Sequence, residues 1–296
     1  MLDTNLQLIE LGATMYMPAL NGSLVEVGNG WKYGNLRSLI FCTEDSVAER
    51  DLPKALDNLT LALLRLEPAP LKRFIRPRNA ELLGKLLAFK GLENIDGFVI
   101  PKADMKSLPD YFSLLENNER FAIMITIETE AAFDLPALYS LRDFLLAHPL
   151  KNRITALRIG ALDLMSILGL RREPGQTIYD TPLRHVIDQL ITVFRPAGFH
   201  IAAPGCEFFD APEILAAELA LDLTRGLMGK TALHPGQLDM INSAYMVSRA
   251  DLDMARAIND PERPAVFRFD GRMCEKAVHA NWAAGIEVRA DIYGVR

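Results

Sequence analysis

Glu128 and Asp163 are the residues in this sequence whose types and spacing are best suited to chemistry. Glu128 directly follows an apolar run that begins at Phe121, and Asp163 lies close behind a second apolar run over 154–159. A short apolar run bounded by polar residues is typical of a strand buried on both faces, as in a parallel sheet. If both strands are parallel, the two carboxylates emerge on the same face. A carboxylate pair with no histidine or cysteine beside it suits a hard, oxygen-binding cation such as Mg²⁺.

Polar residues also end most of the other predicted strands. They are Glu44, Asp45, Arg76, Lys102 and Lys230. Any one of them alone is equally compatible with a solvated strand end or a helix cap, but active sites of α/β barrels lie at the carboxyl ends of the strands. In an otherwise acidic mouth, Arg76 can bind a carboxylate or a carbonyl, because a guanidinium group donates hydrogen bonds as a fork.

Lys102 and His234 each leave two interpretations open. Lys102 follows Ile100 and Pro101, where it can form a Schiff base with a carbonyl substrate or, as we favour, an ion pair with nearby carboxylates. His234, in the segment KTALHPGQ, can be catalytic or a core or loop histidine bonded to the backbone. The sequence contains neither a P-loop nor a G-x-G-x-x-G motif, so it does not indicate ATP or a nicotinamide cofactor.

Eight apolar runs alternate with helical patterns, which predicts an α/β fold of the (β/α)₈ TIM-barrel type. The predicted strands are 13–18, 36–43, 71–76, 95–100, the two runs before Glu128 and Asp163, 199–203 and 224–228. Ser46 with Glu49 three residues later matches a capping box and predicts a helix from 47 to about 65. Thr181 followed by Pro182 predicts the start of another helix.

The residues after 258 do not follow the strand–helix alternation. A proline-containing linker over 260–264 precedes the strand-like segment VFRFDG and a predicted last helix. We therefore predict a barrel domain over 1–258 and a C-terminal helical arm over 259–296.

The composition is typical of an acidic globular enzyme. The 296 residues are 50% hydrophobic, enough to bury the core of one barrel, and the formal net charge is −6. A nucleic-acid partner is not expected, because phosphate binding needs a basic stripe and none is visible. The cysteines, an odd number without CxxC spacing, indicate neither disulfides nor a zinc site; they are Cys42, Cys206 and Cys274. The sequence also lacks a signal-peptide pattern and an apolar run of the length a membrane helix needs, so we expect a cytoplasmic protein without a membrane partner.

Four segments in the same order resemble the motifs of one known family. The segments TEDSV over 43–47, IET over 127–129, GALDL over 160–164 and GKTALHPGQ over 229–237 match its LEDAV, IET, GxxDL and GKWxIHPxQ motifs. They resemble the HpcH/HpaI aldolase and citrate lyase β-subunit superfamily, and more closely its citrate lyase-like branch, which includes malyl-CoA and citramalyl-CoA lyases. A DGxM element over 270–273 extends the match, whereas Thr231 stands where tryptophan is usual.

The resemblance implies a TIM barrel that binds Mg²⁺ through Glu128 and Asp163. It implies cleavage of a β-hydroxyacyl thioester, or the reverse Claisen-type condensation, through an enolate held on the metal. Arg76 is the residue expected to contact the carbonyl end of the substrate. Arg78 is the alternative, because the family's third-strand RVN pattern reads Arg-Pro-Arg-Asn here. Among the other polar residues at strand ends, Glu44 and Asp45 are further catalytic candidates, and Lys102 and Lys230 are further candidates for substrate binding.

The resemblance also assigns a role to Glu275. In malyl-CoA and citramalyl-CoA lyases an aspartate after the DGxM element acts as acid or base, and the arm covers the barrel of the next subunit. Glu275 stands close behind this element and carries the same carboxylate on a stem that is one methylene longer. The implied assembly is a homotrimer or a multiple of one. The alternative is an ordinary surface glutamate on the last helix.

Three functions remain open on the sequence alone. The leading hypothesis is a Mg²⁺-dependent carbon–carbon lyase that acts on a small hydroxy acid or its CoA thioester. A class II pyruvate aldolase would use the same barrel but normally needs a histidine base near the mouth. A non-enzymatic member that keeps metal and ligand binding and acts in a larger complex is the third hypothesis.

Overall fold

The computed structural model describes residues 7–296, and the chain divides into two compact units. The first unit ends at Leu238, and the second extends over Asp239–Arg296. No helix among the described residues is both long and apolar enough to cross a membrane.

The first unit is a barrel of eight parallel strands, which confirms the predicted fold. The strands are β1 (Thr14–Pro18), β2 (Ser38–Cys42), β3 (Lys72–Arg76), β4 (Gly97–Ile100), β5 (Ala122–Ile127), β6 (Ile154–Ile159), β7 (Ile201–Ala202) and β8 (Thr231–Ala232). Each strand pairs with the next from β1 to β7, and β8 pairs with β1. The ring closes just before β8, where Ala202 forms a parallel bridge with Met228 and the Ala203 amide donates to the Met228 carbonyl at 2.8 Å.

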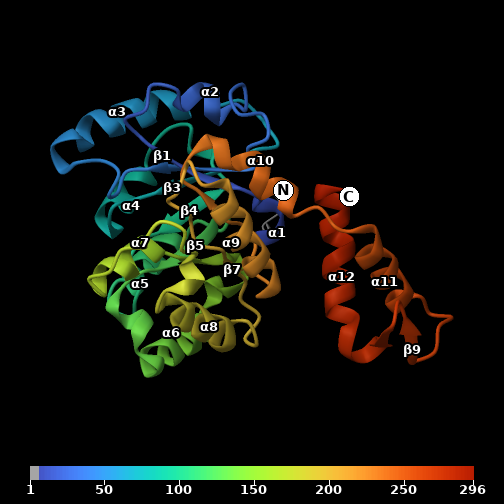
Figure 1. Cartoon of the computed structure of the whole chain (residues 1–296). Helices are drawn as coiled ribbons and strands as arrows, with labels where there is room; N and C mark the ends of the chain where they lie inside the picture. Colours follow the sequence, from blue (N-terminus) through green and yellow to red (C-terminus); the bar gives the residue numbers. More distant parts are fainter. Residues whose placement is uncertain (1–6) are drawn as a thin grey trace. The chain divides into compact units, whose positions relative to one another are not determined.

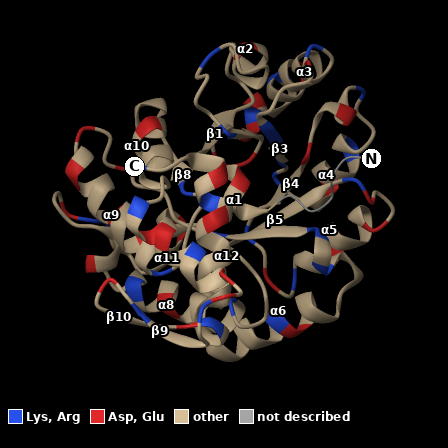
Figure 2. Ribbon diagram, turned by 90° about the vertical axis from the view of Figure 1, so that its right-hand side faces the viewer, with Lys and Arg blue, Asp and Glu red and all other residues tan. Residues whose placement is uncertain are grey.

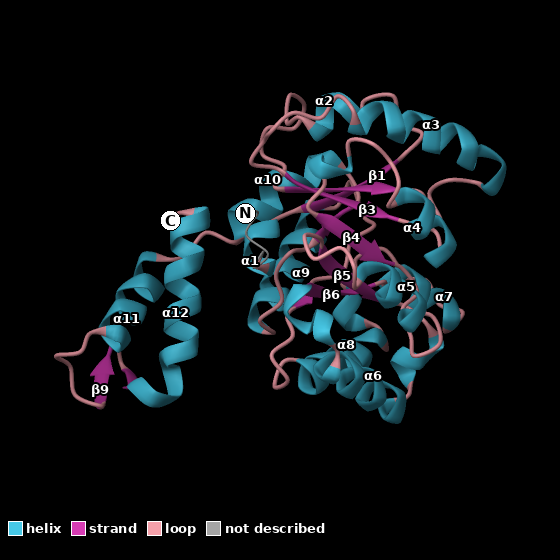
Figure 3. Cartoon of the chain, turned by 180° about the vertical axis from the view of Figure 1, so that it is seen from behind, coloured by secondary structure: helices cyan, strands magenta, loops and turns pink. Residues whose placement is uncertain are grey.

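Helices surround this barrel (Figures 1 and 3). They are α1 (Leu8–Leu11), α2 (Leu24–Gly28), α3 (Leu52–Leu63), α4 (Ala80–Leu86), α5 (Leu108–Leu115), α6 (Leu135–Ala147), α7 (Ala161–Ile167), α8 (Leu183–Phe194) and α9 (Pro212–Thr224). Proline occupies the first turn of α3, α5, α6 and α9, where its missing N–H removes no helical hydrogen bond. The outer helices α6 and α8 each carry one arginine and one aspartate, and charged positions of both signs are coloured on the ribbon in Figure 2.

The interior of the barrel is apolar at its amino-terminal end and polar at its carboxyl end. Ile40, Phe74, Met124 and Ala156 belong to one buried core cluster that also includes Leu8 and Leu11 of α1. Because side chains alternate along a strand, the next inward positions lie two residues further on. Those positions are Cys42, Arg76, Thr126 and Arg158. The sequence therefore changes from apolar to polar along the inward face of β2, β3, β5 and β6.

Two local predictions are wrong. Of the predicted strand over 224–228, Met228 pairs with Ala202 in an isolated bridge, the rest is the end of α9 and the turn after it, and β8 begins only at Thr231. Gly226 and Gly229 have φ values of 70° and 62°, a left-handed backbone that interrupts an extended strand. The helix expected from residue 47 is preceded by a 3₁₀ turn, η1 (Glu49–Asp51), and α3 starts at Leu52.

The second unit has its own small core. It contains most of α10 (Leu238–Ala244), then α11 (Arg249–Asn259), a hairpin of β9 (Val266–Phe269) and β10 (Arg272–Glu275), and α12 (Lys276–Tyr293). The boundary falls after Leu238 instead of after 258, because α11 buries its apolar side chains against α12 and the hairpin. Asp270 and Gly271 form the hairpin turn with φ values of 45° and 74°. Two consecutive positive φ values at an Asp-Gly pair are typical of a type I′ turn.

Candidate active site

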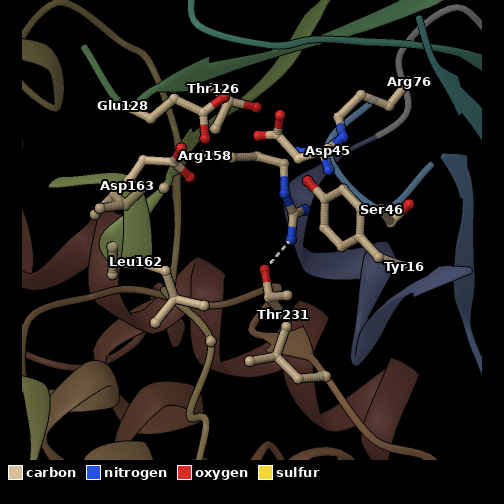
Figure 4. Close-up of a pocket in the computed structure, with 15 residues that line it drawn as sticks. Tyr16, Asp45, Ser46, Arg76, Thr126, Glu128, Arg158, Leu162, Asp163 and Thr231 are labelled. Carbon is tan, nitrogen blue, oxygen red and sulfur yellow. Dashed lines mark hydrogen bonds between the residues drawn. The ribbon is translucent and has the colours of Figure 1, made fainter. Parts of the chain in front are cut away.

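A cavity of about 280 Å³ opens at the carboxyl ends of the barrel strands. Its lining comes from strands on all sides of the barrel and from the loops that follow them (Figure 4). The lining residues are Tyr16, Asp45, Ser46, Arg76, Thr126, Glu128, Arg158, Ile159, Gly160, Ala161, Leu162, Asp163, Gly205, Thr231 and Leu233. The cavity therefore occupies the position at which TIM-barrel enzymes carry out their chemistry.

Glu128 is held at the cavity wall by two backbone segments. Its side chain is 4% exposed, and its Oε1 accepts a hydrogen bond of 2.8 Å from the Lys102 amide. Lys102 has a φ of 45°, an uncommon backbone for a residue other than glycine. On the other side, a Cβ at Gly160 would lie 2.1 Å from Oε2 of Glu128, so no other residue fits there without displacing the carboxylate. The glycine of the GALDL segment is thus required by the Glu128 side chain.

Asp163 lies beside Glu128 in the first turn of α7. Figure 4 shows both carboxylates at the same side of the cavity. Burial, reinforced by the negative charge of Asp163, raises the pKa of Glu128 to about 7, although the Lys102 amide and Arg76 act in the opposite direction. As carboxylates, the buried Glu128 and the half-buried Asp163 repel one another, and a divalent cation between them would relieve that repulsion.

The donor set of this site fits Mg²⁺. Among residues 7–296, no group of three or more His, Cys, Asp and Glu side chains is arranged to hold a metal ion. Mg²⁺ commonly uses one or two carboxylates and keeps several water molecules, and the cavity leaves room for such water. Zinc, which is usually bound by three or four nitrogen or sulfur ligands, does not fit this site.

Arg76 lies at the end of β3 with its side chain 13% exposed. Its Nη2 lies 3.1 Å from Oε2 of Glu44, and both Nε and Nη2 donate to the Cys42 sulfur at 3.2 and 3.1 Å. The guanidinium group also packs over the Tyr16 ring, 4.8 Å from its centroid. Burial alone would lower the pKa of Arg76, but the electrostatic effects of Tyr16, Cys42 and Glu44 outweigh it and raise the pKa above its ordinary value. Arg76 is therefore a fixed cation at the cavity wall.

Glu44, Asp45 and Lys102 form an ion-pair cluster next to Arg76. The Lys102 ammonium lies 2.9 Å from Glu44 and 2.8 Å from Asp45, and the Asp45 amide donates to Glu44 at 2.7 Å. Burial opposes the ionised form of Lys102, yet its bonds to Asp45 and Glu44 raise its pKa. The same ammonium outweighs burial and lowers the pKa of Asp45. Lys102 is thus a charged ion-pair partner, and a Schiff base, which needs the neutral amine, does not fit this arrangement.

Arg158 also lines the cavity, although the sequence motifs did not point to it. It lies in β6, is 2% exposed, and donates from Nη2 to the Thr231 hydroxyl at 2.6 Å. The signal in the sequence was an arginine inside an otherwise apolar strand, two residues before Gly160. Arg158 lies within β6, whereas the polar residues predicted for the site follow strand ends.

Comparison with known proteins identifies the family. A family model described as "C-C_Bond_Lyase of the TIM-Barrel fold" matches residues 5–295. The chain belongs to this family. Its family membership makes it a carbon–carbon bond lyase, as the sequence motifs predicted.

Several relatives of this lyase are known. An L-malyl-CoA/beta-methylmalyl-CoA lyase of Haloarcula marismortui is 27% identical over 234 residues, which are 73% of this chain and 66% of that enzyme. A (3S)-malyl-CoA thioesterase of Cereibacter sphaeroides is 23% identical over 269 residues, 89% of both chains. The crystal structure of CitE from Mycobacterium tuberculosis, in complex with magnesium, acetoacetate and coenzyme A, superposes with a TM-score of 0.70 and 21% identity. That alignment covers 95% of this chain and 98% of CitE, and it agrees with the barrel fold.

Three residues predicted to bind substrate in this lyase lie outside the cavity lining. One is Lys102, whose ammonium is held by Glu44 and Asp45. The other two are Arg78 and Lys230. Arg78 donates to the backbone carbonyls of Thr43, Glu44 and Val47, so it holds the loop after β2. Lys230 is fully buried, and its ammonium bonds to Glu218 at 3.0 Å and to Asp222 at 2.8 Å. Since Lys230 immediately precedes β8 and turns toward α9, its charge is not available to a ligand, and we correct its predicted role to a structural one.

His234 and Glu275 have local partners in the lyase. Nδ1 of the exposed His234 accepts from the Gly236 amide at 3.1 Å, which is the loop role considered for this histidine. Glu275 ends β10 and precedes α12, where its amide donates to Nδ1 of His279 at 3.0 Å. Its carboxylate is partly buried within the second unit, and its catalytic role remains a prediction.

Proposed function

We propose that this protein is a Mg²⁺-dependent carbon–carbon lyase that cleaves or forms a small β-hydroxy acid or its CoA thioester. The observation that carries the proposal is the carboxylate pair of Glu128 and Asp163 in a cavity that also presents Arg76. A cation site next to a fixed guanidinium group suits a substrate whose oxygens gain negative charge during the reaction.

Glu128 and Asp163 would hold the metal ion. When bound there, Mg²⁺ would act as a Lewis acid that stabilises negative charge on a substrate oxygen as the carbon–carbon bond breaks. The Lys102 amide fixes one oxygen of Glu128, and Gly160 leaves the space that the other oxygen needs. The protein thus orients the carboxylate before any ligand arrives.

Arg76 would orient the substrate through the donors that its protein partners leave free. Its Nε and Nη2 are used by Cys42 and Glu44, and Nη1 makes no hydrogen bond among the described residues. A carbonyl or carboxylate oxygen of the substrate can accept from Nη1 while the rest of the guanidinium group stays in place. Glu44 is then a positioning residue, because Arg76 and Lys102 occupy both of its oxygens.

Asp45 is the better candidate for contact with the reacting molecule. It lines the cavity, and its side chain is 56% exposed. Because its bond to Lys102 lowers its pKa, it stays a carboxylate at neutral pH and can accept a hydrogen bond from a substrate hydroxyl. This arrangement would hold the hydroxyl group of a β-hydroxy acid in the cavity.

The proposed substrate class rests on the names of the relatives and on the residue types that line the cavity. Enzymes named for malyl-CoA are the similar sequences reported above, which favours a CoA thioester over a free acid. No histidine among the described residues lines the cavity, and this disfavours the class II pyruvate aldolase, which would use a histidine base. We further propose that Glu275 acts as acid or base from a neighbouring subunit in a homotrimer or a multiple of one.

The proposal is tested by incubating the protein and MgCl₂ with malyl-CoA or citramalyl-CoA and measuring release of acetyl-CoA. We expect Mg²⁺-dependent release that falls by about 10³-fold or more in Glu128→Gln and in Asp163→Asn, as when a group that stabilises transition-state charge is removed. Glu81→Gln, which changes a carboxylate that is 75% exposed on α4, is the matched control and should keep full activity. Absence of Mg²⁺-dependent release with both thioesters would contradict the proposal.

A further inference from the structure

Arg158 carries a buried positive charge that the protein does not neutralise. It is 2% exposed and forms no ion pair with any described carboxylate. Its hydrogen bonds go to neutral atoms, the Thr231 hydroxyl at 2.6 Å and the Met124 sulfur at 3.6 Å, and its Nε has no partner. Burying a charge without a counter-charge is costly, so such an arrangement requires a compensating group.

The other buried arginines of the barrel are compensated in ways that Arg158 is not. Arg172 pairs with Glu207 and Glu218. The guanidinium group of Arg73 donates to the backbone carbonyls of Gly28 and Glu67 at 2.7 and 2.5 Å. Arg158 bonds to neither a carboxylate nor a carbonyl among the described residues, yet it lines an open cavity.

A second polar group without a partner lies next to Arg158. The Thr126 hydroxyl is buried and makes no hydrogen bond, and Thr126 is 3% exposed. β5 and β6 pair in a register that places Thr126 directly opposite Arg158, and both side chains line the cavity. Buried polar groups are almost always satisfied, so two neighbouring donors without acceptors indicate a site for a ligand.

Tyr16 sets the position of this guanidinium group. The Tyr16 ring lies 5.5 Å from Arg158 and 4.8 Å from Arg76, so the two cations share one aromatic partner. Figure 4 shows the Arg158 side chain reaching from the strand toward Tyr16 and Thr231. Arg76 already has Glu44 as its counter-ion at 3.1 Å, which leaves Arg158 as the cation that needs an anion.

We propose that Arg158, with Thr126, forms a carboxylate-binding subsite on the floor of the cavity. The inference rests on the proposed function and specifies its substrate as a hydroxy acid with a free carboxylate beyond the groups held near Glu128 and Asp163. Arg158 precedes Gly160 by two residues in the chain, and two residues of a strand span roughly 6.6 Å, so the subsite lies deeper than the carboxylate pair. In a small dicarboxylic acid or its monothioester, the free carboxylate can reach this deeper level while the hydroxyl group stays near the carboxylate pair.

A carboxylate explains the donor set better than other ligands. Guanidinium and hydroxyl groups donate hydrogen bonds, and a carboxylate accepts several of them in one plane. A cation would be repelled by Arg158, and an uncharged group would leave the buried charge uncompensated. Because Arg158 is almost inaccessible, the anion must also be small, which excludes the bulky phosphorylated end of a CoA molecule from this position.

The test compares malate with 3-hydroxybutyrate, which differ by replacement of one carboxylate with a methyl group. Binding to the full-length protein is measured by calorimetry with and without MgCl₂. We expect the wild-type protein to bind malate about tenfold more tightly or better, because a hydrogen-bonded charged pair is lost with the methyl group. In Arg158→Met this preference should fall to within about twofold, with 3-hydroxybutyrate binding unchanged.

Two further variants keep the result interpretable. Thr126→Val, which is similar in shape to the wild type, should reduce the preference for malate by several-fold. Arg158→Lys keeps the charge without the fork and should retain only part of the preference, which covers the case in which Arg158→Met does not fold. Arg158→Met should melt at the wild-type temperature or above when no ligand is present, because it removes an uncompensated buried charge.

The results separate the subsite from the proposed function. A preference for malate that depends on Arg158, without Mg²⁺-dependent thioester cleavage, would support the subsite and contradict the lyase proposal. Cleavage that proceeds while Arg158→Met and Arg158→Lys retain the wild-type preference for malate would overturn the subsite alone. Equal binding of the two acids by the wild-type protein would overturn it as well.

Discussion

Two clusters of charged side chains in the barrel unit contain the same residue types but differ in function. One lies between α9 and the start of β8, where Lys230 bonds to Glu218 and Asp222, and Arg172 bonds to Glu218 and Glu207. The other lines the cavity and includes Arg76, Glu128, Asp163 and Arg158.

The difference between the clusters is whether the charges are satisfied within the protein. In the α9 cluster each cation has two carboxylate partners, and even the Tyr179 hydroxyl donates to Asp222. In the cavity, neither Glu128 nor Asp163 forms an ion pair with a cation of the described residues, and Arg158 forms none with a carboxylate. The α9 cluster, in which every charge is paired, stabilises the fold. The cavity cluster leaves unpaired charges that can bind a metal ion and a substrate.

Lys230→Met should reduce the free energy of unfolding by about 3–5 kcal/mol, because the buried Asp222 loses its cation and Glu218 keeps only Arg172. The measurement is a urea denaturation curve followed by circular dichroism. Turnover per folded molecule should stay at the wild-type level. Glu128→Gln should behave in the opposite way, with turnover lost and stability kept. A Lys230→Met protein that is stable but cannot bind substrate would show that the α9 cluster is part of the site.

Gly160→Ala should weaken Mg²⁺ binding by about 100-fold, because the added Cβ occupies the space of the Glu128 carboxylate at 2.1 Å. The backbone at Gly160 has a φ of −83°, which alanine adopts readily, so the effect is one of space and not of backbone strain. Gly84→Ala, within helix α4, is the matched control. Its Cβ would meet only the Leu114 side chain of α5, at an ordinary contact distance of 3.7 Å. Normal metal binding by Gly160→Ala would mean that Glu128 is not a ligand in this position.

Arg76→Lys should weaken substrate binding by about tenfold while the melting temperature changes little, because lysine keeps the charge but not the fork. Arg78→Lys is the comparison, and it should lower the melting temperature with little effect on substrate binding. Its guanidinium group bonds to backbone carbonyls after β2, and lysine cannot reach all of them at once. Steady-state kinetics and thermal melts of both variants decide between them, and a reversed pattern would assign substrate to Arg78.

Mg²⁺ binding should strengthen as the pH rises through about 7. Because burial and the nearby Asp163 raise the pKa of Glu128 to about 7, the group is protonated below that pH and must lose its proton to bind the metal. The apparent affinity should fall by up to about tenfold per pH unit below 7 and level off above it. Calorimetry in two buffers of different ionisation enthalpy measures the released proton. Binding that does not depend on pH, with no proton released, would contradict this account.

Much of the fold could be predicted because most strands are buried on both faces. β2, β5 and β6 appear in the sequence as continuous apolar runs, and their predicted limits lie close to the observed ones. β8 could not be found in this way, because it is two residues long and is preceded by the left-handed Gly226 and Gly229. β7 is equally short, but it lies within an apolar run over 199–203, whereas β8 follows Gly229 and Lys230 and begins with Thr231.

Only the site residues that follow the end of an apolar strand could be predicted from the sequence. Glu128, Asp163 and Arg76 follow apolar runs, and all three line the cavity. The direction of a side chain depends on register, however, and Lys230 follows the same rule yet turns toward α9. Arg158 lies inside its strand, so only the pairing of β5 with β6 reveals that it meets Thr126 in the cavity.

A calorimetric titration of MgCl₂ into the wild-type protein, Glu128→Gln and Asp163→Asn tests the central claim most directly. The account predicts one bound Mg²⁺ per chain in the wild-type protein, no measurable binding to either variant, and normal binding to the exposed control Glu81→Gln. Wild-type affinity in both Glu128→Gln and Asp163→Asn would contradict it, because the open carboxylate pair would then not be the metal site.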